Sequence, residues 1–518
     1  MPRIAILLLA VSLLFAATPG AHAQFPFGLG GKRDNPRDTN RDNPRDAAAR
    51  DDAPPRLRDM LRKNGRSDAR QEALDQAHAD IDTAYQGGHY DKVVALADQL
   101  LQTEPTDHVA YHMRASAKIE LGRIAGDNKQ VRDGIADSRQ ALALAGLEHA
   151  WLYIPYLYGL TSLAEIEKRP DHAALAVKVA GPVIQRPGVS ATDQGNLLYQ
   201  RGLAYEVQKD TPHAAADFKE TISLSRDHLA AHLELARAYA AGGQKDAALA
   251  AYDSAVSAFS NNALLVNDRG AYRRTSGDLD GAMSDFTRAT QIDPKFSMGY
   301  VNRGVCLIEQ NEPMAAEGDF DQALALAPRT AMAHRLRGTA RLMQGKLPEA
   351  IKDYTDALNL APQDLAVREE RGFARFFQKD YTGAAADFQE ALRRAPQLRH
   401  LAPWQSLAQT RAGKADAAAV ALSAVKPAAG SPDWVTSLAR FLRAEISDQE
   451  LLDAAKAPNT SLQTSRVCEA HYFIGQKQAL AGAQDQAAEH YRECLATRAF
   501  MLAAYRGARY ELKDFSTR

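Results

Sequence analysis

Small, aromatic and proline residues recur along this chain with a period of 34 positions. Each period holds a glycine, an alanine twelve positions later, an aromatic residue four positions after that, and a closing proline. The four clearest periods contain Gly270, Gly304, Gly338 and Gly372, with Ala282, Ala316, Ala350 and Ala384, Phe286, Phe320, Tyr354 and Phe388, and Pro294, Pro328, Pro362 and Pro396. Proline cannot continue a helix, so each proline ends its unit. The pattern predicts tandem pairs of antiparallel helices, with glycine at their closest approach and the ring filling the gap between units.

This pattern resembles the tetratricopeptide repeat, a 34-residue helix-turn-helix unit. The resemblance implies an all-α fold, a right-handed α-solenoid of tandem repeats, and a role as a binding scaffold. Six units without an insertion fill residues 195–396, of which the first two contain Gly202, Ala214 and Phe218, and Ala236, Ala248 and Tyr252.

The helical pattern is weaker on both sides of the six units. We expect divergent repeat-like helices over 71–194, a degenerate repeat with short helices over 397–463, and a C-terminal unit with a capping helix over 464–518. Ser447 with Glu450 predicts a capping box at the start of one short helix. A closing helix is expected because a terminal repeat must cover an exposed apolar face.

Residues 1–23 have the layout of a secretory signal peptide, with Arg3, an apolar stretch from Ile4 to Ala17, and small residues before Gln24. Residues 24–70 contain RDNPRD twice and few apolar residues, which predicts a disordered linker. An uncleaved anchor and a basic recognition arm are the respective alternatives. We therefore expect a periplasmic or secreted protein with no integral membrane span after signal removal.

The charge is balanced, with 63 Lys and Arg against 64 Asp and Glu, so the composition gives no sign of a nucleic-acid partner. No nucleophile elbow, phosphate loop or zinc helix is present in the sequence. His108 with His112, and His228 with His232, share helix faces, but neither pair has a third ligand placed to complete a metal site. We expect no enzyme activity, no cofactor and no metal.

Arginine precedes the small residue in five units, and aspartate precedes the aromatic residue in the same five. The pairs are Arg201–Asp217, Arg269–Asp285, Arg303–Asp319, Arg337–Asp353 and Arg371–Asp387. Units that lack the arginine also lack the aspartate. This joint gain and loss predicts structural ion pairs between the two helices of a unit. The alternative is a cationic stripe for an acidic ligand.

The first helices of such units line a concave groove, and its inward positions are apolar in the later units. They are Val301, Val305, Ile308, Leu342, Met343, Phe373, Phe376 and Phe377. Three phenylalanines within five residues are not expected to enter one core. An exposed apolar stripe would bind a protein or peptide partner. Alternatively, the C-terminal helices from Trp434 onward fold back and cover it.

Three cysteines occur, at positions 306, 468 and 494. An antiparallel hairpin would bring Cys468 and Cys494 level, which allows either a disulfide or two small buried hydrophobic residues. Cys306 is expected to be an inert core thiol.

The C-terminal segment resembles the end of the NlpI-type envelope proteins, through Leu438–Ser447, Leu451-Leu452, Asn459–Leu462 and Cys468–Gly475. The resemblance implies a periplasmic adaptor that presents murein hydrolases to a tail-specific protease. This chain has no lipobox cysteine and a longer array.

The sequence also bears on two other kinds of ligand, chaperone tails and glycans. Recognition of chaperone tails is not expected, because the positions that would need Lys and Asn carry Leu203, Arg237, Ala271, Val305, Thr339 and Phe373. A solenoid that binds glycans is the alternative function, with Trp151, Tyr153, Tyr156 and Tyr158 as an aromatic platform unless they pack in the core.

Overall fold

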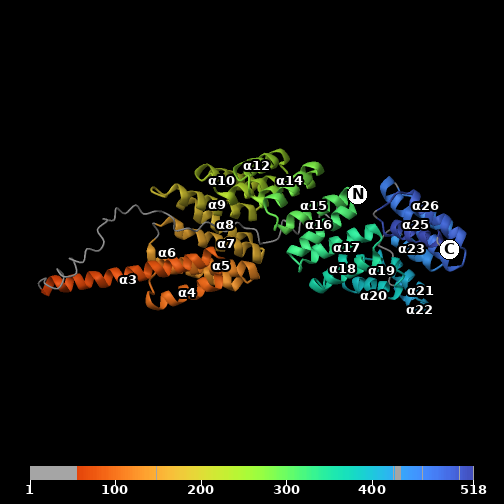
Figure 1. Cartoon of the computed structure of the whole chain (residues 1–518), viewed down its shortest axis with the longest axis horizontal. Helices are drawn as coiled ribbons and strands as arrows, with labels where there is room; N and C mark the ends of the chain where they lie inside the picture. The colour runs from red at the N-terminus through yellow and green to blue at the C-terminus, as the bar shows by residue number, and fades with distance from the viewer. Residues whose placement is uncertain are drawn as a thin grey trace. The chain divides into compact units, whose positions relative to one another are not determined.

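The computed structural model describes residues 55–146, 149–423, 425, 433–457, 459–500 and 502–516. All regular elements in these ranges are helices, and consecutive helices pack as antiparallel pairs in an all-α solenoid (Figure 1). The chain forms two compact units, which divide between positions 261 and 262. The predicted signal peptide (1–23) and residues 24–54 of the predicted linker lie outside the described residues.

The first unit runs to position 261. Its described helices are α3 (Pro55–Gln86), α4 (Tyr90–Thr103), α5 (His108–Ala125), α6 (Asn128–Ala145), the 3-10 helix η1 (Ala150–Leu152), α7 (Tyr153–Glu167), α8 (Pro170–Ile184), α9 (Ala191–Val207), α10 (Thr211–Leu224), α11 (Leu229–Ala241) and α12 (Lys245–Ala258).

The second unit begins at position 262. Its described helices are α13 (Ala263–Ser276), α14 (Leu279–Ile292), α15 (Ser297–Glu309), α16 (Pro313–Leu326), α17 (Ala331–Gln344), α18 (Leu347–Leu360), α19 (Leu365–Phe377), α20 (Tyr381–Arg394), α21 (Leu401–Arg411), α22 (Ala415–Ser423), α23 (Trp434–Leu442), α24 (Asp448–Ala454), α25 (Thr460–Leu480), α26 (Gln484–Ala496) and α27 (Ala503–Ser516).

Helix α3 begins at Pro55, so residues 55–70 are helical and not part of a disordered linker as predicted. The low apolar content of this stretch suggested disorder. However, Leu, Arg, Lys, Gln and Ala are good helix formers, and proline is tolerated in the first turn of a helix. Low hydrophobicity argued against burial but did not exclude a helix.

A residue with a left-handed backbone conformation recurs every 34 positions, in the turn between the two helices of each unit. These residues are Lys209, Gly243, Gly277, Asn311, Gly345 and Lys379, with φ between 60° and 94°. Glycine adopts this conformation without a steric cost, whereas lysine and asparagine adopt it at some cost. The recurrence shows that the six predicted units share one turn geometry.

The spacing of glycine and aromatic ring that recurs along the chain has a steric reason. A Cβ atom on Gly202, Gly304 or Gly372 would lie 2.5, 2.7 or 2.6 Å from the ring of the aromatic residue in the second helix of the same unit. Gly270 and Gly338 have equally close rings, at 2.9 Å. The glycine therefore lets the first helix lie against the ring of its own partner helix, and these rings are buried.

The short helices of the C-terminal part follow the predicted signals. The Ser447 side chain accepts a hydrogen bond from the backbone of Glu450, and the Glu450 side chain accepts one from the backbone of Ser447, so the predicted capping box at α24 is confirmed.

None of the described helices has the length and apolar character that crossing a bilayer requires.

Candidate functional site

The apolar stripe predicted for the groove of the second unit is buried. Phe373, Phe376 and Phe377 on α19 are 5%, 2% and 7% exposed, and Leu342 on α17 is 2% exposed. Val301, Val305 and Ile308 on α15 are also buried, and Met343 is half-buried. The prediction of an exposed binding stripe is wrong for the aromatic residues. The alternative of cover by the C-terminal helices describes these residues and Leu342, whereas Val301, Val305 and Ile308 are buried in a separate cluster.

The cover comes from the C-terminal helices α25 and α27. The Tyr510 ring of α27 stacks on Phe377 with ring centroids 5.2 Å apart, and its hydroxyl donates to the Leu342 carbonyl oxygen over 3.1 Å. On α21, the Trp404 ring lies 5.1 Å from Tyr472 and 5.2 Å from Phe473 of α25. Helix α27 therefore contacts both α17 and α19 through Tyr510.

All three phenylalanines enter one cluster because α19 is covered on more than one side. Phe373 and Phe376 meet Trp404 edge-on, at centroid distances of 5.0 and 5.5 Å. Phe377 faces α27 instead, through Tyr510. The expectation that one helix cannot bury three such residues assumed a partner on one side only.

The structure brings together all five predicted Arg–Asp pairs. In each pair the guanidinium Nε and one terminal nitrogen donate to the two oxygens of the aspartate, as in Arg201–Asp217 at 2.8 and 2.7 Å. The same geometry holds Arg269 to Asp285, Arg303 to Asp319, Arg337 to Asp353, and Arg371 to Asp387. The hydrogen bond that Arg201 donates to Asp217 is the main cause that raises the pKa of Arg201. These arginines are engaged within their units, which argues against a free cationic stripe.

A second arginine, four positions after the first, joins three of the pairs. Arg273, Arg341 and Arg375 reach Asp285, Asp353 and Asp387 at 3.0, 2.8 and 2.8 Å. The sequence contains this signal, since all three lie at the same position of the 34-residue period, but the predicted pairs included only the first arginine of each unit. Each of the three aspartates therefore balances two guanidinium groups.

A second ladder of polar contacts joins successive first helices at a spacing of 35 residues. The Asn302 amide donates to the Asn267 side-chain oxygen over 2.8 Å, and Arg274 pairs with Glu309 at 2.8 Å. Arg335 and Glu370 repeat the arrangement at 3.1 Å. These contacts stabilise the stacking of one unit on the next.

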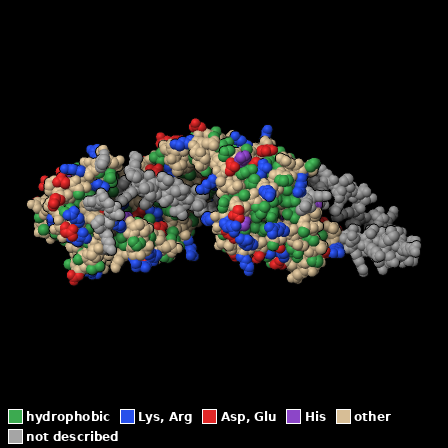
Figure 2. All heavy atoms as spheres, turned by 180° about the vertical axis from the view of Figure 1, so that it is seen from behind, with side chains coloured by type: hydrophobic (Ala, Val, Ile, Leu, Met, Phe, Trp, Pro, Cys, Tyr) green, Lys and Arg blue, Asp and Glu red, His purple; other side chains and the backbone are tan. Residues whose placement is uncertain are grey.

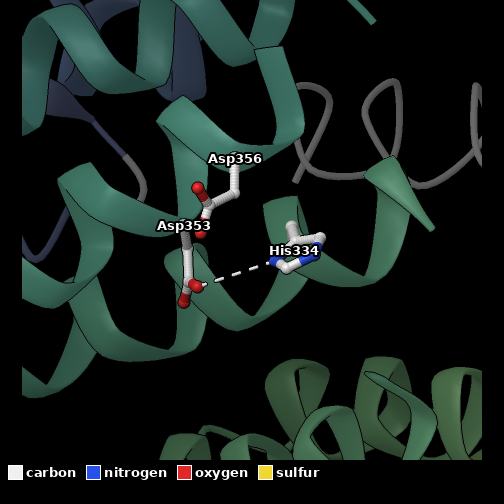
Figure 3. A group of neighbouring side chains, drawn as sticks. All are labelled: His334, Asp353 and Asp356. Carbon is white, nitrogen blue, oxygen red and sulfur yellow. Dashed lines mark ion pairs between the residues drawn. The ribbon is translucent and has the colours of Figure 1, made fainter. Parts of the chain in front are cut away.

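His334, Asp353 and Asp356 form the one group in the described part of the chain whose ligand atoms converge closely enough for a metal ion (Figure 3). The Asp353 carboxylate already accepts hydrogen bonds from Arg337 and Arg341. His334 Nε2 lies 2.9 Å from the Pro328 carbonyl oxygen, and Lys352 pairs with Asp356 at 2.7 Å. A cation would have to compete with these groups, so the cluster fits a structural role.

The first unit carries a row of ionisable residues on consecutive first helices. We call Glu120 of α5, Glu165 of α7, Glu206 of α9 and Glu234 of α11 the acidic row. Arg123 pairs with Glu120 at 3.0 Å, and Arg237 pairs with Glu234 at 3.2 Å. The Tyr158 hydroxyl also donates to Glu120, over 3.0 Å. Two arginines thus accompany four carboxyl groups.

Members of the acidic row influence one another's ionisation. Burial and then the charge of Glu234 raise the pKa of Glu206 to about 9, against the opposing effect of Arg237. The Glu165 side chain is exposed, yet its pKa is raised because surrounding protein atoms reduce its hydration. Burial, Glu234 and Glu206 raise the pKa of Tyr199. The row is therefore one coupled electrostatic group that spans α7, α9 and α11.

We expect the stability of the first unit to fall as the pH rises from about 4.5 to about 9. The folded chain keeps the Glu206 proton up to a pKa of about 9, whereas the unfolded carboxyl loses it near its ordinary value of 4.5. The unfolded state therefore binds fewer protons over this range, and the unfolding free energy decreases with pH. Thermal unfolding of the Glu206→Gln variant should show a flatter pH profile. The exposed Glu220→Gln should keep the wild-type profile, and identical profiles for all three proteins would refute the assignment.

The histidine pairs and the tyrosine cluster serve packing. The His112 ring meets the Trp151 ring edge-on at 4.7 Å, and burial lowers the pKa of His112 to about 3. His228 caps α11, and His232 Nε2 lies 3.2 Å from the Arg226 carbonyl oxygen. Tyr153 and Tyr156 are buried in the core with Arg186 and Arg139 over their rings, which leaves no open aromatic platform at these two residues.

Cys468 and Cys494 lie opposite each other on α25 and α26. Their Sγ atoms are 3.1 Å apart, and all three cysteines of the chain are buried free thiols. Burial raises the pKa of the Cys306 thiol to about 12, as expected for an inert core residue.

The surface shows mixed charge. In the view of Figure 2, Lys and Arg side chains are interspersed with Asp and Glu side chains. This distribution accords with the balanced composition and with the many ion pairs of the described residues.

Comparisons with known proteins bear on the repeats. The family model described as tetratricopeptide repeat matches residues 199–263 and 301–364. None of the curated proteins matches the chain. A tetratricopeptide repeat protein from Parabacteroides merdae is 18% identical, with 48% of this chain and 98% of that chain covered and a TM-score of 0.36.

Two further solved structures are similar to parts of this chain. Pseudomonas aeruginosa pilF is 18% identical over 40% of this chain and 95% of that chain, with a TM-score of 0.36. The first tetratricopeptide domain of Spaghetti (RPAP3), bound to an HSP90 peptide, is 30% identical over 21% of this chain and 87% of that chain, with a TM-score of 0.21. Proteins with such repeats are generally non-catalytic scaffolds for protein–protein interaction. Residues 199–263 and 301–364 of this chain match the tetratricopeptide repeat model, and they lie in an all-α solenoid.

Proposed function

We propose that this protein is a non-catalytic interaction scaffold of the bacterial cell envelope that binds a protein or peptide along the acidic row of its first unit. The observation that carries the proposal is the contrast between the two units. In the second unit, Leu342 and the three phenylalanines of α19 share one buried cluster with α25 and α27. In the acidic row of the first unit, Glu165 is exposed and Glu206 is half-buried, and both act electrostatically together with the buried Glu234.

The chemistry of the acidic row suits an extended or helical peptide with basic side chains. Arg123 pairs with Glu120, Arg237 pairs with Glu234, and Glu206 keeps its proton up to a pKa of about 9. The exposed Glu165 is therefore the member of the row that a basic side chain of a ligand would contact. The side chains project from helices that are folded before a ligand arrives. Binding would therefore cost little ordering entropy, which supports affinity.

The envelope setting is supported by the sequence. The signal-peptide layout of residues 1–23 favours export, and the C-terminal resemblance to NlpI-type proteins favours an adaptor role. Within this proposal the scaffold presents a client to a periplasmic protease or cell-wall hydrolase. The alternative of a glycan-binding solenoid is less favoured, because Tyr153 and Tyr156 are buried.

The test is a cross-linked pull-down from native envelope extract with wild type and two double variants. Glu165→Gln with Glu206→Gln changes the acidic row, and Glu349→Ala with Lys352→Ala changes exposed residues of α18 as the control. We expect a specific partner to be lost from the first variant only, with helicity unchanged by circular dichroism. If wild type and both variants capture the same partners, then the binding site does not lie at the acidic row. If wild type captures no envelope protein, then the proposed location in the cell envelope is refuted.

A further inference from the structure

The hairpin formed by α25 and α26 holds two cysteines in register. Cys468 and Cys494 are each fully buried, and their Sγ atoms lie 3.1 Å apart. A disulfide requires about 2.05 Å between the sulfur atoms, so a movement of about 1 Å would close the bond. Small rotations of two side chains can supply that movement. The separation of the two sulfur atoms is therefore compatible with a covalent link.

We propose that Cys468 and Cys494 form a disulfide in the mature protein and that this bond staples the cover of the second unit. The proposal rests on the proposed envelope location for its oxidising surroundings. Two thiols lose two protons and two electrons to a disulfide oxidant, which is reduced to two thiols as the sulfur–sulfur bond forms. The oxidant is a disulfide-bearing protein or a small-molecule disulfide.

The staple lies in the element that closes the groove. Tyr472 and Phe473 follow Cys468 by four and five residues on α25 and pack against Trp404. Helix α27 follows α26 and places Tyr510 against Phe377. A bond between α25 and α26 would fix the hairpin on which both contacts depend. It closes a loop across 26 positions, which restricts the unfolded chain.

The burial of the thiols indicates when the bond forms. The hydrogen bond with Cys468, followed by burial, raises the pKa of the Cys494 thiol. The thiolate is the species that attacks a disulfide, and it is rare in the folded hairpin. Because both thiols are fully buried in the closed hairpin, a disulfide oxidant would reach them while the hairpin is still open, and the finished bond would be shielded from reductants.

A zinc site is the competing use of this hairpin. His471 and His490 lie beside the cysteines, with their Nδ1 atoms 3.0 Å apart. Zinc accepts sulfur and imidazole ligands in a tetrahedral arrangement. However, among the described residues, three ligand atoms converge on one point only at His334, Asp353 and Asp356. The side chains of this hairpin do not form such a group, whereas the two Sγ atoms are 3.1 Å apart, so the observations favour the disulfide.

The test counts thiols in the full chain, purified without reductant from the envelope fraction. The denatured protein is alkylated before and after reduction, and the products are identified by peptide mass. We expect one alkylated cysteine before reduction, Cys306, and three after it. The Cys306→Ala variant should show none before reduction and two after it. Three alkylated cysteines before reduction in wild type, with or without bound zinc, would contradict the bond in the cell.

A second arm separates failure of the proposed location from failure of the bond. The reduced full chain is unfolded and refolded with oxidised glutathione. A link between Cys468 and Cys494 in this arm, with free thiols in cells, would refute the location but support the pairing. Free thiols in both arms would overturn the inference. The linked protein should also melt at a higher temperature than the Cys468→Ser, Cys494→Ser double variant, and reductant should abolish the difference.

Discussion

Replacing Asp353 by alanine is expected to destabilise the second unit by about 3 kcal/mol. The Asp353 side chain is fully buried and accepts hydrogen bonds from Arg337 at 2.6 and 3.1 Å and from Arg341 at 2.8 Å. Its removal leaves two guanidinium groups partly buried with less counter-charge. Removing one partner from a buried ion pair costs several kcal/mol, because the desolvated charge that remains is uncompensated. Arg337 keeps Asp321 and Arg341 keeps Glu317, so the loss should fall at the lower end of that range.

Asp321→Ala is the matched control, because it removes the other carboxylate that contacts Arg337. The Asp321 side chain is 49% exposed, although its contact of 2.8 Å is equally short. An exposed pair contributes about 1 kcal/mol or less. Urea unfolding followed by circular dichroism measures both variants. Equal and small losses would show that the Arg–Asp ladder is a surface feature and not a buried structural one.

Replacing Phe376 by alanine is expected to cost about 3 to 5 kcal/mol of unfolding free energy. The ring is 2% exposed and meets Trp404 and Tyr381 edge-on, at centroid distances of 5.5 and 5.2 Å. Truncation removes the burial of the ring and leaves a cavity in a cluster that joins α19, α20, α21 and α25. This cluster also anchors the C-terminal helices, so the variant should lose their docking.

The control for this prediction is Phe500→Ala, since Phe500 is 60% exposed and precedes α27. Its loss should change stability by about 0.5 kcal/mol or less. Thermal unfolding of both variants, with capture of envelope partners in parallel, distinguishes a core residue from a contact residue. If Phe376→Ala keeps wild-type stability but loses a partner, then the ring belongs to an open groove and the cover described here is wrong.

The repeat architecture could be predicted because its information is local. A glycine, a ring and a proline at fixed offsets determine the helix pair and its closest contact, and each unit repeats them. The Arg–Asp pairs followed from the same logic, since both residues belong to one helix pair. The arginines four positions further on were equally visible in the sequence but were not connected to the same carboxylates.

The cover of the groove could not be predicted because it depends on distant contacts. Tyr510 and Leu342 meet across 168 positions of the chain, and nothing in either local sequence specifies the other. The aromatic residues of α19 looked like a binding stripe because their partners lie on α21, α25 and α27. The acidic row was missed for a related reason: its members come from the divergent helices as well as from the regular repeats, so they share no single period.

Hydrogen exchange of the full chain, followed by mass spectrometry, tests most directly the claim that the second unit closes its own groove. The structure predicts that amides of α27 exchange slowly and that their protection matches the protection of α17 and α19, because the three helices share buried contacts. Rapid exchange throughout α27, beside a protected α19, would contradict the account and return the aromatic stripe to the list of open binding surfaces.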